Sequence, residues 1–198
     1  MADSYVFAGE TETEMGKVVL GLTLSLDGYI TDQHGRVDRL FADLDSLQHT
    51  EPLRSSIERT GAVVMGRHAY AMGDSDSYAE HYEYQVPIFV LTHAVPDKQP
   101  KENDRLRFTF VTDGIDSAIA QAKAAARDKD VTVIGGASTA RQCIQAQLLD
   151  ELHMSLVPVL FGGGLRPFEH SGMEYLELER IQVIESPTRT DLLFRVVK

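Results

Sequence analysis

The chain has 198 residues, of which 43% are hydrophobic and 25% are charged, as in ordinary globular proteins. Its 19 basic and 30 acidic residues give a net charge of −11, which argues against a broad surface for nucleic acid or an anionic membrane. The single cysteine, Cys143, excludes an internal disulfide framework and a cysteine-rich metal site. Because neither a secretory signal nor an apolar run of about 20 residues is visible, we expect a cytoplasmic protein without a membrane span.

The N-terminal part of the chain predicts an extension followed by a single domain. Residues 1–15 are acidic and polar around a short apolar patch, and no linker divides residues 16–198. Aliphatic and β-branched residues predict the first strand at 17–24. Glycine and aspartate are dense over 25–35, which predicts a turn.

A short helix is predicted next, with Thr50 as its N-cap, Pro52 in its first turn and Gly61 just past its end. The rest of the chain alternates between short apolar runs and helical segments. We predict strands at 62–65, 86–92, 106–111, 131–134, 152–160, 175–184 and 191–197, helices at 67–72, 115–128 and 138–148, and a surface loop at 73–85. This order predicts an α/β fold with a mostly parallel sheet, flanking helices and an antiparallel C-terminal strand pair.

Two strand-to-helix junctions are the first candidates for a ligand site. One is AVVM followed by Gly66, Arg67 and His68, and the other is VTVI followed by residues 135–139. In an open α/β sheet, ligands bind outside the carboxyl ends of the strands, where glycine lets the backbone approach a phosphate. Ordinary βα turns explain a single Gly-Gly turn equally well. Neither junction is a G-x-G-x-x-G or P-loop motif, so a standard dinucleotide or NTPase fold is not supported.

A second hypothesis for the same region is a serine hydrolase. The segment from Gly136 to Ala140 resembles a degraded G-x-S-x-G motif around Ser138, and Asp150 and His153 follow in the order of a catalytic triad. Alanine replaces the last glycine, and two triad members on one strand form a poor triad. The seven histidines show no spacing typical of a metal site, so no metal is expected.

Asp27 is the candidate on the substrate side. It follows the first predicted strand directly, with Gly28 behind it. A carboxylate at this position can accept hydrogen bonds from a ligand's N–H or hydroxyl groups. Capping of the turn by the same carboxylate is an equally good interpretation.

Six segments in order resemble the dihydrofolate-reductase-like family, and most closely its branch in bacterial riboflavin biosynthesis, the C-terminal reductase domain. The resemblance runs from about Lys17 to Lys198. It implies a three-layer fold with a mostly parallel, twisted, mixed sheet of about eight strands. The segments are SLDGYI, VVMGRHAY, VPIFVLTHAVP, VTVIGGAST, LDELHMSLVPVLFGGGLRPF and the closing strand pair.

The resemblance implies that the protein binds NADPH and transfers a hydride to a small heterocyclic or sugar-phosphate substrate. It assigns Asp27 and Glu51 to catalysis, with Glu51 only approximately in register, and Asp27, Ser155 and Gly163 to the substrate side. Arg67 is assigned to the adenosine 2′-phosphate. The positions assigned to the cofactor are Gly66, Arg67, His68, Thr92, His93, Gly135, Gly136, Ala137, Ser138 and Thr139.

This sequence also departs from its relatives. It has no tryptophan and too few cysteines for the zinc deaminase half of the bifunctional riboflavin enzymes, so only a reductase half is expected. The resemblance further implies a homodimer. A non-catalytic nucleotide-binding protein with the same fold is the alternative function.

Overall fold

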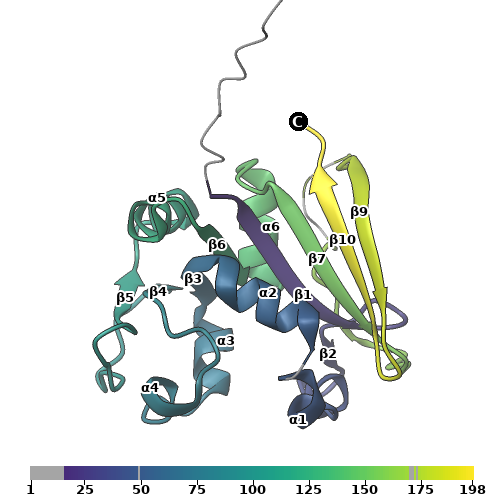
Figure 1. Ribbon diagram of the computed structural model, residues 1–198, viewed down its shortest axis with the longest axis horizontal. Coiled ribbons are helices and arrows are strands. Elements are labelled where there is room, and N and C mark those ends of the chain that lie inside the picture. The colour runs from purple at the N-terminus through teal and green to yellow at the C-terminus, as the bar shows by residue number, and fades with distance from the viewer. Residues whose placement is uncertain (1–15, 49, 170–171, 173) are drawn as a thin grey trace, which may run out of the picture.

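The computed structural model describes residues 16–48, 50–169, 172 and 174–198. The extension expected at 1–15 lies outside the described residues. Within them the chain forms an eight-stranded sheet in the order β5-β4-β3-β6-β1-β7-β10-β9, with helices on both faces (Figure 1). A two-stranded sheet pairs β2 with β8.

The strands and helices lie close to the predicted positions. The strands are β1 (Val18–Ser25), β2 (Thr31–Asp32), β3 (Thr60–Gly66), β4 (Ile88–Leu91), β5 (Phe108–Val111), β6 (Asp130–Ile134), β7 (Glu151–Val157), β8 (Gly164–Leu165), β9 (Leu178–Glu185) and β10 (Thr190–Val196). The helices are η1 (Asp38–Leu40), α1 (Leu44–Leu47), α2 (Glu51–Arg59), α3 (Arg67–Met72), α4 (Tyr78–His81), α5 (Ile115–Ala126) and α6 (Ala137–Gln145).

The pairing of these strands confirms the predicted fold class. The pairs from β5 across to β7 are all parallel, whereas β10 is antiparallel to both β7 and β9. Each parallel crossover needs a connection that returns along the sheet, and α5 and α6 supply two of them. The closing hairpin needs only a short turn, so it ends the sheet as an antiparallel edge.

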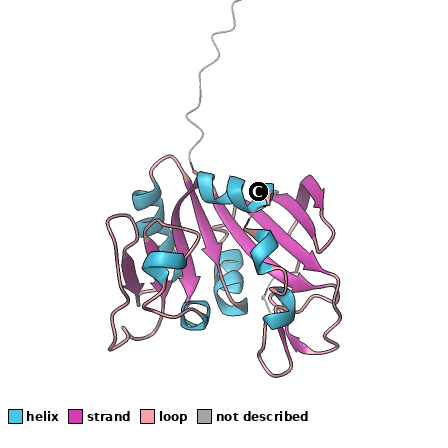
Figure 2. Cartoon of the chain, turned by 60° about the horizontal axis from the view of Figure 1, so that its bottom comes forward, coloured by secondary structure: helices cyan, strands magenta, loops and turns pink. Residues whose placement is uncertain are grey.

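Two apolar clusters hold the helices against the sheet. On one face, α5 and α6 bury Ile115, Ala118 and Cys143 against alternate side chains of the central strands, such as Leu20 and Val133. On the other face, the second cluster joins α2, α3 and α4 to the alternate side chains of β3 and β4. Figure 2 shows these helices on the two sides of the sheet. Because β3 and β4 are buried on both faces, their sequences are continuous apolar runs rather than alternating patterns.

Two local predictions were wrong, and two others were right only in part. Gly61 does not end α2 but lies inside β3, where the register with β6 shifts and where a Cβ would meet the Ala126 carbonyl oxygen at 2.8 Å. The predicted loop at 73–85 contains α4. The predicted turn at 25–35 is present as turns closed at Gly28 and Gly35, with the two-residue strand β2 between them. Thr50 is the N-cap of α2, but its hydroxyl donates to the Leu47 carbonyl rather than accepting from the helix.

A buried ion pair fastens the closing hairpin to the segment that follows β2. The Arg189 guanidinium, whose side chain is 2% exposed, binds both carboxylate oxygens of Asp43 and donates to the Leu40 carbonyl oxygen. A guanidinium held in this way keeps the turn between β9 and β10 against η1 and α1. The contact joins residues that are 146 positions apart in the chain.

Paired charges line the amino-terminal edge of the central strands. Glu151 is bonded to His153 at 3.1 Å and to Lys17 at 3.0 Å, while Asp130 pairs with Arg59 at 2.8 Å. A hollow of about 440 Å³ opens beside them, lined by Gly16, Lys17, Glu58, Arg59, Asp128, Lys129 and Asp130. This hollow lies at the edge opposite the glycine turns. None of the described helices is long and apolar enough to cross a membrane.

Replacing Glu151 should destabilise the fold in a pH-dependent way. The hydrogen bond from His153 and the contacts with Lys17 lower the pKa of Glu151 from 4.5 to about 2, although burial opposes them. The ionised form therefore stabilises the fold above pH 4.5, and this contribution is lost as the pH falls toward 2. We expect Glu151→Gln to cost about 3 kcal/mol at pH 7, measured by urea unfolding.

The exposed pair of Glu179 with Arg195 offers a matched control, because both side chains are more than half exposed. Glu179→Gln should change the free energy of unfolding by less than about 1 kcal/mol. A difference between wild type and Glu151→Gln that stayed constant from pH 7 down to pH 2 would contradict this role for the carboxylate.

Candidate functional site

The parallel pairing of β3 with β6 brings the two glycine turns together. Met65 lies opposite Ile134, so Gly66 and Gly135 leave the sheet at the same level on neighbouring strands. Both turns then enter helices, α3 and α6, without a capping side chain. The two junctions, which the sequence predicted as separate candidates, therefore lie side by side and form one candidate site at the carboxyl edge of the sheet.

Thr139 fills the space between the two turns. A Cβ at Gly66 would lie 2.5 Å from the Thr139 hydroxyl oxygen, and a Cβ at Gly135 would lie 3.0 Å from the Thr139 Cβ. Thr139 itself is only 3% exposed. It therefore acts as a packing residue that requires glycine on both sides, and its side chain is turned away from solvent.

The first turn of α6 can hold an anion. Its N–H groups have no partner inside the helix, and no side chain caps them. A Cβ at Gly136 would meet nothing within 4 Å, so the approach to these groups is open. Ser138 is exposed in the same turn, whereas Ala137 is buried. Open N–H donors at a helix N-terminus are the usual partners of a phosphate group.

The remaining residues that the resemblance assigned to the cofactor border these turns. Gly66 lies opposite Leu91 of β4, which places Thr92 and His93 next to Arg67 along the sheet edge. Arg67, His68 and His93 are exposed. The Thr92 hydroxyl is engaged in its own turn, where it donates to the Ala94 carbonyl oxygen at 2.9 Å. Thus the Arg67 guanidinium and the two imidazole rings face solvent, while Thr92 holds the loop that follows β4.

The turn after β1 and the glycine loop after β7 are joined through Asp27. Its carboxylate accepts the N–H groups of Phe161 at 3.1 Å and Gly162 at 2.8 Å, as well as the Ser25 hydroxyl at 2.7 Å. The bond from Ser25 and the two N–H groups lower the pKa of Asp27 to about 2. The carboxylate is therefore ionised near neutral pH, where it accepts hydrogen bonds and is a poor proton donor.

Other contacts hold the same two loops together. Thr31 pairs with Leu165, and a Cβ at Gly164 would lie 1.9 Å from the Thr31 carbonyl oxygen, so only glycine fits there. The Arg166 guanidinium stacks on the Tyr29 ring at 4.3 Å and donates to its hydroxyl. The sequence did not predict this pair, because no local pattern indicates a contact between residues that are 137 positions apart.

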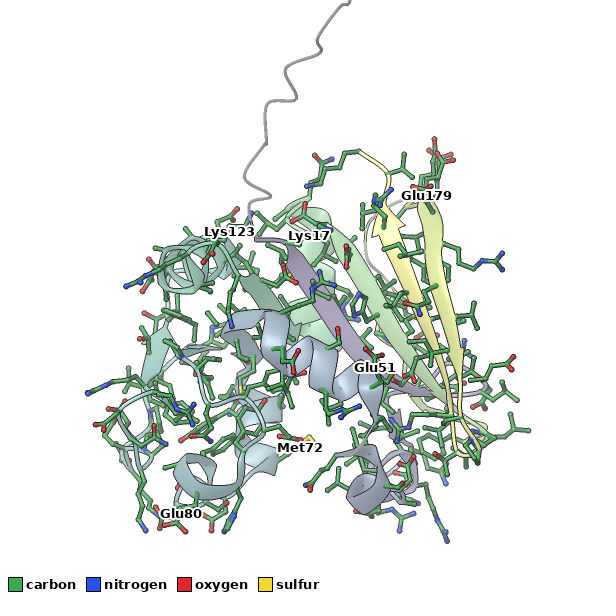
Figure 3. The ribbon with its side chains drawn as sticks, viewed as in Figure 1. Lys17, Glu51, Met72, Glu80, Lys123 and Glu179 are labelled. Atoms are coloured by element: carbon green, nitrogen blue, oxygen red, sulfur yellow. The ribbon has the colours of Figure 1, made fainter. Side chains whose placement is uncertain are left out.

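Among the other residues assigned to the substrate side or to catalysis, Gly163 directly follows Gly162, which donates to Asp27, whereas Ser155 and Glu51 lie on other elements. Ser155 is in β7 and donates a hydrogen bond to Asp191 of β10. Gly163 lies between β7 and β8. Glu51 is exposed at the N-terminal end of α2, as Figure 3 shows. Asp191 was not predicted from the sequence, since an aspartate in a closing strand carries no motif.

The serine-hydrolase hypothesis is wrong in this structure. The Ser138 hydroxyl accepts a hydrogen bond from Gln142, Asp150 binds the Val18 N–H, and His153 binds Glu151. No described hydrogen bond links Ser138 to either supposed partner. Among the residues that the structure describes, no group of three or more His, Cys, Asp or Glu side chains could hold a metal ion.

Comparison with known proteins decides the family. The model of the RibD C-terminal domain matches residues 16–189 of this chain. The chain belongs to the RibD C-terminal domain family. Within the curated proteins, the uncharacterized YwjB of Bacillus subtilis (strain 168) is 24% identical over 155 residues, which cover 77% of this chain and 82% of YwjB.

Solved structures share the fold of this RibD C-terminal domain. A Shewanella sp. PV-4 protein assigned to riboflavin biosynthesis has a TM-score of 0.70 and 23% identity, covering 92% of this chain and 99% of that one. Dihydrofolate reductase from Enterococcus faecalis, solved with NADP(H), has a TM-score of 0.58 and 14% identity over 93% and 98% of the two chains. These likenesses confirm the dihydrofolate-reductase-like fold.

Substitutions of Gly66 and Gly136 should show which glycine is required for packing and which leaves space for a ligand. Gly66→Ala should destabilise the fold by about 1–3 kcal/mol, because the new methyl group would overlap the buried Thr139 hydroxyl. Gly136→Ala should cost little, because its Cβ meets no atom within 4 Å. Thermal unfolding monitored by circular dichroism measures both effects.

A double variant tests whether overlap with the Thr139 hydroxyl is what destabilises Gly66→Ala. Thr139→Ala removes the hydroxyl that the added methyl would overlap, so Gly66→Ala should cost less in that background than in the wild type. Equal costs in the two backgrounds would show that Gly66 is required for another reason.

Proposed function

We propose that this protein is an NADPH-dependent reductase that transfers a hydride to a small heterocyclic or sugar-phosphate substrate. The observation that carries the proposal is the joining of two glycine turns and the open N-terminus of α6 at one edge of the sheet. Membership of the RibD C-terminal domain family and the fold shared with an NADP(H)-bound dihydrofolate reductase support it.

The residues at this edge fit a dinucleotide. The N–H groups in the first turn of α6 would hold the pyrophosphate, and Gly135 and Gly136 let the backbone come close to it. Arg67, exposed at the start of α3, would pair with the adenosine 2′-phosphate, with His68, Thr92 and His93 bordering it. When bound, NADPH would supply the hydride.

The substrate side is proposed to lie over the carboxyl ends of β1 and β7. Asp27 would keep the loop that carries Gly163 closed against the turn after β1, and Ser155 would face the substrate from β7. Glu51 would approach from the N-terminal end of α2. The protein would thus orient the substrate, while the proton that follows the hydride comes from water or a side chain.

We also propose that the protein is a homodimer. The strand β9 ends the sheet, so its outer backbone groups have no strand partner in the described chain. It carries Ile181 and Val183 exposed at 43% and 41%. An unpaired edge strand with exposed apolar side chains can pair with the same strand of a second copy. Light scattering coupled to gel filtration should give twice the mass of the 22.0 kDa chain, and a monomeric mass would contradict the proposal.

The reductase proposal makes a specific prediction for Arg67. Arg67→Gln should weaken NADPH binding by about 1.5–3 kcal/mol, because a charged hydrogen bond to the 2′-phosphate is lost. Binding of NADH, which lacks that phosphate, should not change. Titration followed by nicotinamide fluorescence measures both affinities.

Arg54 of α2, which is also exposed, offers a matched arginine control. Arg54→Gln should leave both affinities unchanged. Equal losses for NADPH and NADH in Arg67→Gln would contradict the assignment of Arg67 to the 2′-phosphate. No NADPH binding by the wild type at sub-millimolar concentration would overturn the reductase proposal itself.

A further inference from the structure

One row of residues crosses the large sheet just before the glycine turn that follows β6. Five residues of neighbouring strands lie opposite one another there, namely Met65, Ile134, Gly21, His153 and Leu193. Residues in register on neighbouring strands project from the same face of a sheet. Met65 and Ile134 belong to the apolar cluster that packs against α2, α3 and α4, so His153 lies on that face too. In the described chain, the helices of this face stop at α2, and β7 and β10 lie beyond it (Figure 1).

Gly21 leaves an open space between Ile134 and His153. A Cβ at Gly21 would meet only the Val133 carbonyl oxygen within 4 Å, at 4.0 Å, so packing does not require glycine there. β6 ends at Ile134, whereas β1 and β7 continue. Because neighbouring strands are about 4.8 Å apart, His153 lies about 10 Å from the end of β6. The imidazole therefore borders a bare strip of backbone next to the glycine turn.

Glu151 determines which ring nitrogen of His153 is available. The His153 Nε2 lies 3.1 Å from a carboxylate oxygen of Glu151. The hydrogen bond from His153 and the contacts with Lys17 lower the pKa of Glu151 to about 2, so the carboxylate is ionised and only accepts hydrogen bonds. Nε2 therefore carries the proton of the neutral ring. The lone pair is on Nδ1, which has no recorded partner in the described part of the chain.

The other charged groups near this pair are engaged with one another or with Glu151. Facing the pair from the packed elements are Lys17 before β1, Arg59 at the end of α2, Asp130 of β6, and Asp191 and Arg195 of β10. Arg59 pairs with Asp130 at 2.8 Å and lies 4.0 Å from Glu151. Gly21 and Leu193, directly opposite His153, carry no charge. Glu151 is thus the recorded ionic partner of the imidazole and orients it in both protonation states.

Reduction of a C=N or C=O bond needs a hydride on carbon and a proton on the neighbouring atom. Asp27 is a poor source of that proton, because its ionised carboxylate is held by the loop after β7. An imidazole gains and loses a proton near neutral pH more readily than other side chains do. We propose that His153, oriented by Glu151, is the catalytic residue that delivers this proton. The inference rests on the proposed reductase function, whose acid it names.

The proposed step balances with one proton from His153. The substrate carbon receives a hydride from NADPH, which is oxidised to NADP⁺. The π electron pair of the C=N or C=O bond moves to the nitrogen or oxygen, which takes the Nδ1 proton of the imidazolium. The ring is left neutral with its Nε2–H still bonded to Glu151. A proton from water restores the imidazolium, since the His153 side chain is 26% exposed.

Ring ¹⁵N NMR of the full chain tests the geometry without a substrate. The neutral His153 ring should carry its proton on Nε2 and its lone pair on Nδ1, and His153→Gln identifies its signals. His81 is the control, because its side chain is 77% exposed and its contact with Glu80 is 3.9 Å long. It should show a mixture of both tautomers. A neutral His153 ring with its proton on Nδ1 would overturn the inference.

Two matched probes separate proton transfer from hydride transfer. 3,4-Dihydroisoquinoline and its N-methyl iminium salt accept a hydride at the same carbon, but only the imine also needs a proton on nitrogen. His153→Gln keeps an N–H for Glu151 but has no imidazolium proton to give. At a pH above the pKa of the free imine, it should lower kcat for NADPH oxidation by about 10²-fold with the imine and by less than about threefold with the iminium salt. Imidazole added to His153→Ala should restore part of the rate with the imine.

The controls distinguish this inference from the reductase proposal. His81→Gln should leave both rates unchanged. Equal losses with both probes in His153→Gln, or no loss with either, would overturn the role of His153 and leave the reductase proposal standing. The same holds if the wild type binds NADPH but reduces neither probe. If the wild type does not bind NADPH, the reductase proposal fails and the proton-transfer role fails with it.

Discussion

The alignment of β3 with β6 is the constraint on which the rest of the site depends. Because Met65 and Ile134 are opposite one another, two turns from distant parts of the chain begin at the same level. Thr139 packs between them at distances that admit no Cβ at Gly66. The backbone N–H groups of α6 are thereby fixed in direction by packing rather than by side-chain caps. A site on packed strand ends is held more precisely than a site on loops.

The substrate side is organised differently, by polar contacts between loops. Asp27 binds N–H groups of the loop after β7, Arg166 stacks on Tyr29, and Arg189 fastens the closing hairpin to Asp43. These contacts use charged side chains, whereas the proposed cofactor side uses glycine and threonine. The hydrogen bond from Ser25 and the N–H groups of Phe161 and Gly162 lower the pKa of Asp27 to about 2, since the ionised form is the one that accepts them. The net charge of −11 is compatible with the proposed anionic cofactor, because the donors that would meet it are local.

Much of the fold was predictable because local patterns agree with it. Apolar runs marked the strands, and an alanine-rich stripe marked α5, with its end misplaced by two residues. Gly61 was misread because a glycine after a helix is usually a cap, whereas here the close approach of Ala126 in α5 requires it. The short elements β2 and α4 were missed, since segments of two and four residues carry too little periodicity.

The sequence by itself determined the order of the elements, the two glycine junctions, and the absence of a disulfide framework. Those features depend on residue type and on spacing along the chain. Only the tertiary structure decided which of these residues meet: that Gly66 and Gly135 share Thr139, that Asp27 binds the Gly162 loop, and that Ser155 donates a hydrogen bond to Asp191. These are contacts across strands, and strand order and register are set by packing of the whole core.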